Sequence, residues 1–163
     1  MKKNSDSPKE FLQLEDITHP FEKPCIMDIK IGKDRIWGRE RTLENLQQAF
    51  EEYLVQFRPA TTLDTLDMFI ERLKAIQKWF LNQKILHFYA SSLLFVYEGH
   101  SQLPPTVDIR MIDFSHVFSM EKEPELDENY IHGLIKIIEI FEKIRNEHKQ
   151  KDEKKEVLNP LDK

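Results

Sequence analysis

The sequence predicts an α+β fold in which an antiparallel sheet is packed against helices. Two apolar runs rich in β-branched and aromatic residues, 88–97 and 109–114, are separated by a turn and a short loop, a pattern typical of a β-hairpin. Three longer stretches place apolar residues at intervals of three and four, which indicates amphipathic helices. Strands and helices of this kind bury one apolar face each, so we expect them to share one core.

The length and composition are those of one domain with polar ends. A chain of 163 residues that is 40% hydrophobic and 33% charged can form one ordinary core and is too short for two. We expect the domain to span 11–147, with a disordered polar tail at 1–10 and a charged, solvated tail at 148–163.

Charge and hydropathy exclude several classes of protein. The formal net charge of -5 argues against broad electrostatic attraction to nucleic acid or anionic lipid, so any anion site has to be local. The sequence has no stretch of about 18 apolar residues and no hydrophobic signal core, so we expect neither a membrane span nor secretion. The one cysteine, Cys25, cannot form an internal disulfide and suits a reducing cytoplasmic or nuclear compartment.

Two extended segments are predicted before the first helix. Apolar residues in 11–18 indicate a short extended segment. The run 25–31 is apolar and β-branched and is bounded by Pro24 and Gly32, a pattern typical of a buried strand.

Two amphipathic helices follow. The first opens after Thr42, which is a suitable N-cap, and is stopped by Arg58 and the proline after it. The second starts at Thr61 or Thr62 and ends near Asn82. Each carries a single apolar stripe that predicts packing on one side.

A hairpin and a last helix complete the predicted domain. The strands 88–97 and 109–114 are joined by a short loop that carries two prolines. The last helix is capped by Asp127 and runs to about Arg145, beyond which the sequence is too charged to pack.

Two motifs within these elements carry the candidate chemistry. Residues 24–32 read Pro-Cys-Ile-Met-Asp-Ile-Lys-Ile-Gly, so Asp28 and Lys30 are one residue apart in the predicted strand. Side chains alternate between the faces of a strand, which places this carboxylate and this ammonium on the same face. Asp113 follows an apolar strand and precedes Phe114, as does the magnesium-binding aspartate of protein-kinase-like folds. Together the motifs indicate phosphoryl transfer.

Each motif also has a simpler interpretation. A single Asp-x-Lys is more often a surface salt bridge, and an aspartate after a strand often serves a turn. Ser92 precedes two leucines, as the metal-binding asparagine of protein kinases precedes its strand. Ser92 could therefore contact a metal ion or its water, or it could satisfy backbone groups at the start of a strand.

The chain resembles the inositol polyphosphate kinase family, and within it the multikinases. The resemblance spans most of 14–145. It implies a fold like the C-terminal lobe of that family's protein-kinase-like (SAICAR-synthase-like) architecture, and transfer of the γ-phosphate of ATP to an inositol phosphate. Besides the Asp-x-Lys string, it is carried by LEDITH at 14–19, WFLNQKILHFYASSLLFVYEG at 79–99, VDIRMIDFSHVF at 107–118 and YIHGL at 130–134.

The resemblance implies a catalytic role for three residues and a magnesium site. Asp113, with Ser92, would hold Mg²⁺. Asp28 would contact the nucleotide or orient the substrate hydroxyl, and Lys30 would neutralise the phosphate as it moves. His116 would reach the inositol phosphate.

The resemblance also implies a hinge between two lobes at 11–18. There the backbone of Glu15, Asp16 and Ile17 would bond the adenine of ATP. These positions need no special side-chain chemistry.

Two parts of the family's architecture have no counterpart in this sequence. Only about 13 residues precede the hinge, too few for the β-rich lobe that supplies a phosphate-binding lysine. After Gly32 the family carries a basic, glutamine-containing segment for the inositol phosphate, whereas here 33–39 leads almost directly to the next helix. The glutamines at 47–48 are flanked by Glu44 and Glu51, whose carboxylates would repel a polyphosphate.

These departures leave two hypotheses. In the first, the chain is an ATP-dependent inositol polyphosphate kinase, with activity impaired in this short form. In the second, it is a catalytically inactive, truncated family member that acts as a binding or interaction protein. A protein partner that covers the surface where the missing lobe would sit is a further expectation. Nucleic acid and membranes are not expected partners.

Overall fold

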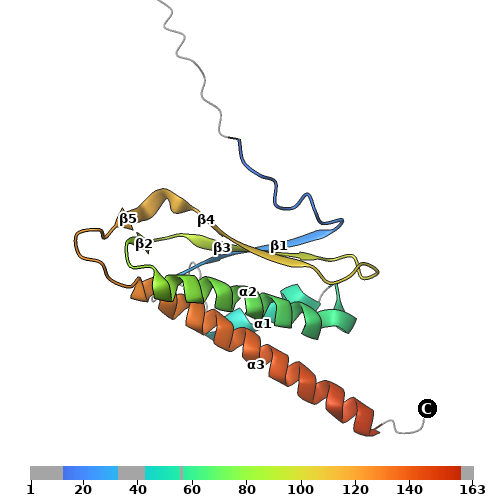
Figure 1. Ribbon diagram of the computed structural model, residues 1–163. Coiled ribbons are helices and arrows are strands. Elements are labelled where there is room, and N and C mark those ends of the chain that lie inside the picture. Colours follow the sequence, from blue (N-terminus) through green and yellow to red (C-terminus); the bar gives the residue numbers. More distant parts are fainter. Residues whose placement is uncertain (1–12, 33–42, 56, 159–163) are drawn as a thin grey trace, which may run out of the picture.

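The computed structural model describes residues 13–32, 43–55 and 57–158, and in them a three-stranded antiparallel sheet lies on a layer of helices (Figure 1). This arrangement confirms the predicted α+β class. A two-stranded ribbon lies at one end of the sheet. The elements are, in order, β1 (Pro24–Lys30), α1 (Leu43–Val55), η1 (Pro59–Thr61), α2 (Thr62–Asn82), β2 (Leu86–Phe88), β3 (Ser92–Glu98), β4 (Val107–Ile112), η2 (Phe114–His116), β5 (Val117–Ser119) and α3 (Glu128–Leu158).

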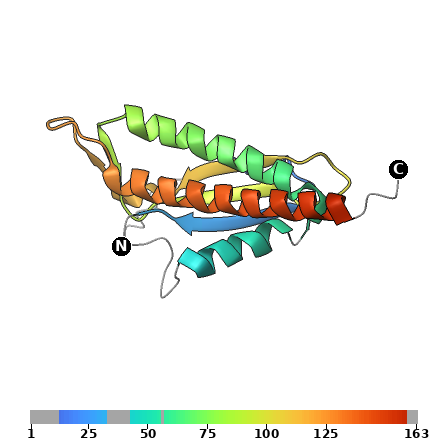
Figure 2. The same cartoon turned by 90° about the horizontal axis from the view of Figure 1, so that it is seen from below.

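The sheet is covered by helices on one face. Its strand order is β1-β3-β4, and the predicted hairpin is the antiparallel pair β3 and β4. Figure 2 shows α3 between α1 and α2, with the sheet behind them. Four fully buried phenylalanine rings fill the space between the layers, with Phe141 of α3 4.7 Å from Phe50, 5.7 Å from Phe95 and 5.9 Å from Phe69 between ring centroids. The main hydrophobic core therefore lies between the sheet and the helices.

The strand predicted over 88–97 is wrong in one respect, because it is two strands in the structure. β2 ends at Phe88 and β3 begins at Ser92, and Ala90 between them has a φ of 55°. A left-handed residue cannot continue a strand, so the chain changes direction there. β2 then pairs with β5 rather than with the main sheet. This break could not be predicted from the sequence, because alanine rarely adopts a left-handed conformation.

Two other extended predictions also need correction. Residues 13–16 are irregular and 17–20 form a turn, in which the Asp16 carboxylate accepts hydrogen bonds from the Thr18 backbone and hydroxyl, so no strand forms there. β1 is not buried on both faces. Cys25 and Ile29 are buried against the helices. Asp28 is exposed on the opposite face, which no described helix covers.

The helices follow the prediction, except that α3 continues to Leu158 rather than ending near Arg145. The expected charged tail is thus helical over part of its length, and it is exposed at 151–154. No helix in the described ranges is both long and apolar enough to cross a membrane. The predicted tail at 1–10, the predicted cap Thr42 and the residues 33–39 lie outside the described residues.

Asp127 caps α3 as predicted, and it also joins this helix to β2. Its buried carboxylate accepts a hydrogen bond from the Tyr130 backbone at 3.0 Å and another from the Phe88 backbone at 2.7 Å. The cap satisfies a free N–H group of the first helical turn. The start of α3 is therefore fixed beside the segment that leads into β3.

Arg58 is a structural residue that the sequence analysis treated only as a helix stop. Its side chain is 2% exposed. It donates hydrogen bonds to the hydroxyl of Thr61 and to the backbone carbonyls of Glu98, His100 and Leu103, at distances from 2.6 to 3.2 Å. It therefore ties the connection between α1 and α2 to the loop between β3 and β4.

The Glu98 carboxylate fixes the chain that enters β1. It is buried and accepts hydrogen bonds from the backbone N–H groups of Glu22, Lys23 and His100 at 2.7 to 3.0 Å. Burial alone would raise the pKa of this carboxyl, but the donated hydrogen bonds, that from His100 first, hold it below its ordinary value.

We expect Glu98→Gln to lower the free energy of unfolding by about 2 kcal/mol, since a neutral amide forms weaker hydrogen bonds with the three donors. Because the folded-state pKa lies below the ordinary value of 4.5, the carboxylate stabilises the wild type above that pH, and this contribution is lost as the pH falls through the folded-state pKa. Urea unfolding at pH 7 and at pH 3.5 measures both effects. Glu121→Gln, at an exposed position, is the control. A difference between Glu98→Gln and wild type that stays constant with pH would contradict this role.

Candidate functional site

Three predicted residues meet at one end of the main sheet. Lys30 is the last residue of β1, Ser92 the first of β3, and Asp113 follows the last residue of β4. The Ser92 hydroxyl lies 3.4 Å from Oδ2 of Asp113, and the Lys30 ammonium lies 4.0 Å from the same oxygen. Ser92 is buried, whereas the side chains of Lys30 and Asp113 are half exposed. The two motifs, about eighty residues apart in sequence, therefore form one open site.

The backbone conformation of Asp113 directs its carboxylate toward Lys30 and Ser92. Its φ and ψ are 64° and 61°, so it lies in the left-handed region. Aspartate tolerates that conformation better than most residues, and such conformations are concentrated at functional sites. Its side chain makes no capping hydrogen bond to the following η2, whereas its left-handed backbone is compatible with the simpler interpretation of an aspartate that serves a turn.

Asp28 shares the exposed face of β1 with Lys30, as predicted. The two side chains form no ion pair in the described structure, and Lys30 pairs with Asp113 instead. The lysine of Asp-x-Lys thus takes part in a half-exposed ion pair, as the simpler interpretation allowed, but its partner is Asp113 rather than Asp28. Asp28 is left exposed beside the site, where its carboxylate can accept a proton or a hydrogen bond.

The site lies on the face of the sheet that the helices do not cover, and this face is partly apolar there. In register, Lys30 is opposite Ser92 and Ser92 is opposite Ile112, so these side chains form one row across the strands. Direct partners share a face. Ile112 is half-buried on this open face because it alternates with Met111, which packs against the core. An apolar surface bordered by charges is suited to a ligand that has both an apolar and an anionic part.

One predicted hinge residue interacts electrostatically with a residue of this face. The Arg110 guanidinium is bonded to Asp108 at 2.6 Å, and that carboxylate first, with a smaller contribution from Glu15, raises the pKa of Arg110. The backbone carbonyl of Asp16 accepts a hydrogen bond from His19 at 3.2 Å, while no backbone hydrogen bond from Ile17 to another described residue is found.

His116 lies at the same end of the chain's fold as Asp113, three residues further on in η2. Its ring is exposed, with Nδ1 3.0 Å from the Ser115 hydroxyl, and its carbonyl accepts a hydrogen bond from the Tyr89 backbone at 2.9 Å. The structure therefore fixes the backbone of His116 and leaves its ring accessible. It shows no contact between His116 and the group of Lys30, Ser92 and Asp113.

Gly133 is a site-supporting residue that the sequence analysis missed. A Cβ atom at Gly133 would lie 2.8 Å from a methyl carbon of Ile31 and 3.1 Å from the backbone nitrogen of Gly32. The start of α3 thus packs directly on the two residues after Lys30. Ile31 is in turn hydrogen-bonded to the carbonyl of Ser91 at 3.0 Å. The YIHGL segment carried this signal as a glycine inside a helix.

The oxygen ligands present fit a magnesium-like ion that is shared with a phosphate ligand. Asp113 and Ser92 supply hard oxygen atoms, which Mg²⁺ prefers, and Mg²⁺ is commonly bound by one or two carboxylates together with substrate phosphates. The described residues contain no group of three or more His, Cys, Asp or Glu side chains that could hold a metal ion by themselves. The site is therefore suited to a metal–nucleotide complex rather than to a free metal ion.

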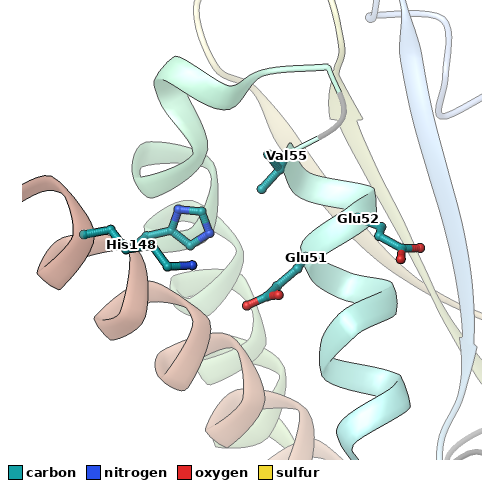
Figure 3. Close-up of a pocket in the computed structure, with 5 residues that line it drawn as sticks. Glu51, Glu52, Val55 and His148 are labelled. Carbon is teal, nitrogen blue, oxygen red and sulfur yellow. The ribbon is translucent and has the colours of Figure 1, made fainter.

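A groove of about 610 Å³ lies elsewhere, between α1 and α3. Figure 3 shows His148 between the two helices, with Glu51 turned toward α3 and Glu52 turned away from it. Glu147 of α3 accepts a hydrogen bond from Gln47 at 3.2 Å, so this glutamine joins α1 to α3. With two carboxylates in its lining, this groove is a poor site for a polyphosphate.

Known proteins resemble this chain in sequence over most of its length. The family model described as inositol polyphosphate kinase matches residues 11–36 and 33–142. The mouse inositol polyphosphate multikinase is 33% identical in an alignment 139 positions long, gaps included, that covers 56% of this chain and 34% of that protein. The mouse inositol hexakisphosphate kinase 3 is 25% identical in an alignment 209 positions long, gaps included, that covers 86% of this chain and 52% of that protein. The chain thus spans about a third to a half of these relatives.

Solved structures resemble it in fold. The inositol phosphate multikinase Ipk2 from S. cerevisiae, in complex with ADP and Mn²⁺, matches with a TM-score of 0.66 and 20% identity over 79% of this chain and 81% of that one. A second inositol phosphate multikinase structure matches with a TM-score of 0.55 and 19% identity over 82% of this chain and 85% of that one. Both likenesses support the fold described above.

Proposed function

The chain belongs to the inositol polyphosphate kinase family, and from this premise we propose that it binds ATP with a divalent metal ion at the open end of its sheet and transfers the γ-phosphate to an inositol phosphate. The observation that carries the proposal is that the Lys30 ammonium and the Ser92 hydroxyl both lie close to the same carboxylate oxygen of Asp113. A cation, a hydroxyl and a carboxylate from three strands are the groups that phosphoryl transfer requires a protein to position.

Asp113 and Ser92 would hold the metal ion in this proposal. A bound Mg²⁺ would bridge phosphate oxygens and neutralise charge that develops on them. The Ser92 hydroxyl, 3.4 Å from the carboxylate, is placed to orient Asp113 or to contact a metal-bound water. Because Ser92 is buried at the start of a strand, its position is rigid.

Lys30 and Asp28 would serve the reacting groups. With a metal ion on Asp113, the Lys30 ammonium would be free to contact the moving phosphate. Asp28 is two residues earlier on the same face, and we assign it the role of orienting the acceptor hydroxyl and accepting its proton. The bond from the γ-phosphorus to the β-phosphate oxygen breaks, and a new bond to the acceptor oxygen forms.

The remaining predicted residues would bind the adenine of ATP and the inositol phosphate. We propose that the backbone of the segment with Glu15, Asp16 and Ile17 bonds the adenine, and the electrostatic interaction of Glu15 with Arg110 of β4 supports this role. The exposed ring of His116 is proposed to contact the inositol phosphate. The contact would be strongest with a protonated imidazole, which donates from both nitrogens.

We test the proposal by incubating the chain with Mg²⁺, radiolabelled ATP and a panel of inositol phosphates that differ in phosphate number, with products separated by anion exchange. The proposal predicts a labelled product whose rate falls at least about 100-fold in Lys30→Met, as expected when a group that stabilises transition-state charge is lost. Lys122→Met, an exposed lysine away from the site, should retain the wild-type rate.

The second hypothesis, a family member that binds without catalysis, gives a different result. Metal-dependent ATP binding with no labelled product from any inositol phosphate would support it. A folded chain that neither binds ATP nor forms product would contradict the kinase proposal and would leave only an interaction role that does not need the nucleotide.

A further inference from the structure

We infer that Arg110 is a specificity residue of the nucleotide site, where its guanidinium stacks on a purine base. The inference rests on the proposed function and assigns a role to a residue that lies within the matched segment 107–118 but had no role assigned from the sequence. It follows from the place of Arg110 on the open face, from the way its side chain is held, and from the chemistry of its neighbours.

The register of the sheet places Arg110 one row away from the catalytic group. Asp28 is opposite Leu94, and Leu94 is opposite Arg110, so the three side chains form a row across the open face. The adjacent row contains Lys30 and Ser92, next to Asp113. Rows two residues apart are separated by roughly 7 Å along a strand. A nucleotide whose phosphates lie at Asp113 would thus extend its base over the row of Leu94 and Arg110.

The guanidinium of Arg110 is fixed by Asp108 at one nitrogen, and the rest of the group is accessible. Its Nε donates to Asp108 Oδ2 at 2.6 Å, and its side chain remains 49% exposed. Its terminal nitrogens make no hydrogen bond to another described residue. Asp108 itself is mostly buried and also faces Arg72 of α2 at 3.7 Å. The guanidinium plane is therefore anchored at one edge, with a face available to a ligand.

The neighbours of Arg110 favour a flat, aromatic ligand over another anion. Leu94 supplies a half-buried apolar surface beside the guanidinium. An arginine plane that is weakly hydrated stacks well on aromatic rings, and a purine offers a larger ring than a pyrimidine. Asp108 and the nearby Glu15 offset the positive charge, so an additional phosphate gains little here.

The inference is tested by calorimetry with Mn²⁺ and three ligands: ADP, UDP and tripolyphosphate. Arg110→Ala should weaken ADP binding by roughly 3- to 30-fold, the range expected for a cation–π contact. UDP binding should weaken less, and tripolyphosphate binding should be unchanged. Arg110→Lys should behave like the alanine variant, because it retains the charge and loses the plane.

Arg72→Ala is the matched control. Arg72 contacts the same Asp108 carboxylate, but it reaches β4 from α2, and its side chain is 59% exposed. The control should leave the affinities for all three ligands unchanged.

The possible outcomes separate this inference from the proposed function. Equal weakening of ADP and tripolyphosphate in Arg110→Ala would overturn stacking in favour of a general charge effect. Unchanged ADP binding in Arg110→Ala, with binding that is still abolished in Asp113→Asn, would overturn the role of Arg110 and leave the proposed function standing. A wild-type chain that binds none of the ligands would overturn both.

Discussion

Replacing Asp113 by asparagine is expected to weaken the binding of ADP with Mn²⁺ at least about 100-fold and to abolish kinase activity, since no other described carboxylate lies within the group formed by Lys30 and Ser92. The amide has nearly the same shape and no charge. The fold should survive, because the Asp113 side chain is half exposed and makes no capping hydrogen bond. Isothermal titration calorimetry with and without Mn²⁺ measures the loss.

Asp64→Asn is the control for this variant, because Asp64 is an exposed carboxylate in the first turn of α2, outside the site. It should bind ADP as the wild type does. Retention of metal-dependent binding by Asp113→Asn would mean that the metal is held by other residues, and the site would have to be placed elsewhere.

Replacing Arg58 by methionine is expected to lower the free energy of unfolding by about 3 kcal/mol. The methionine fills much of the same space but leaves the carbonyls of Glu98, His100 and Leu103 without their donor, and each buried group that loses its partner costs about 1–3 kcal/mol. Total stabilities are of order 5–15 kcal/mol, so the loss is a large fraction. Urea unfolding followed by circular dichroism measures it.

Arg72→Met provides the comparison, since it makes the same change at an exposed arginine with one contact at 3.7 Å. Its effect should stay within about 0.5 kcal/mol. Equal effects of the two variants would show that the hydrogen bonds of Arg58 do not hold the loop between β3 and β4.

The helices and strands were predictable where apolar residues recur with one period, over several turns of a helix or at alternate positions of a strand. The stripe of Leu66, Ile70 and Leu73 in α2 is buried as expected, and Asp127 caps α3 through a local hydrogen bond. The break at Ala90 was not predictable, because the apolar run continues across it and the left-handed backbone depends on packing between β2 and β5. Local propensity does not record such a tertiary effect.

The candidate site was predictable in its members but not in its pairing. Alternation along a strand placed Asp28 and Lys30 on one face, yet the partner of Lys30 is Asp113, which only the strand order β1-β3-β4 brings near. Gly133 packs beside this site and Arg58 holds the opposite end of the hairpin, and both roles depend on segments distant in sequence. The sequence shows the residue types, and the antiparallel register determines which of them meet.

We expect a metal–nucleotide complex to bind at the end of the sheet where Lys30, Ser92 and Asp113 meet. An NMR spectrum of the isotope-labelled chain with ADP and a trace of paramagnetic Mn²⁺, compared with ADP and Mg²⁺, locates the bound metal ion. Broadening centred on the amides of Ser92 and Asp113 is the predicted result. Broadening centred on Glu51 and His148 in the groove between α1 and α3, or bound ADP with no broadening at Asp113, would contradict the claim.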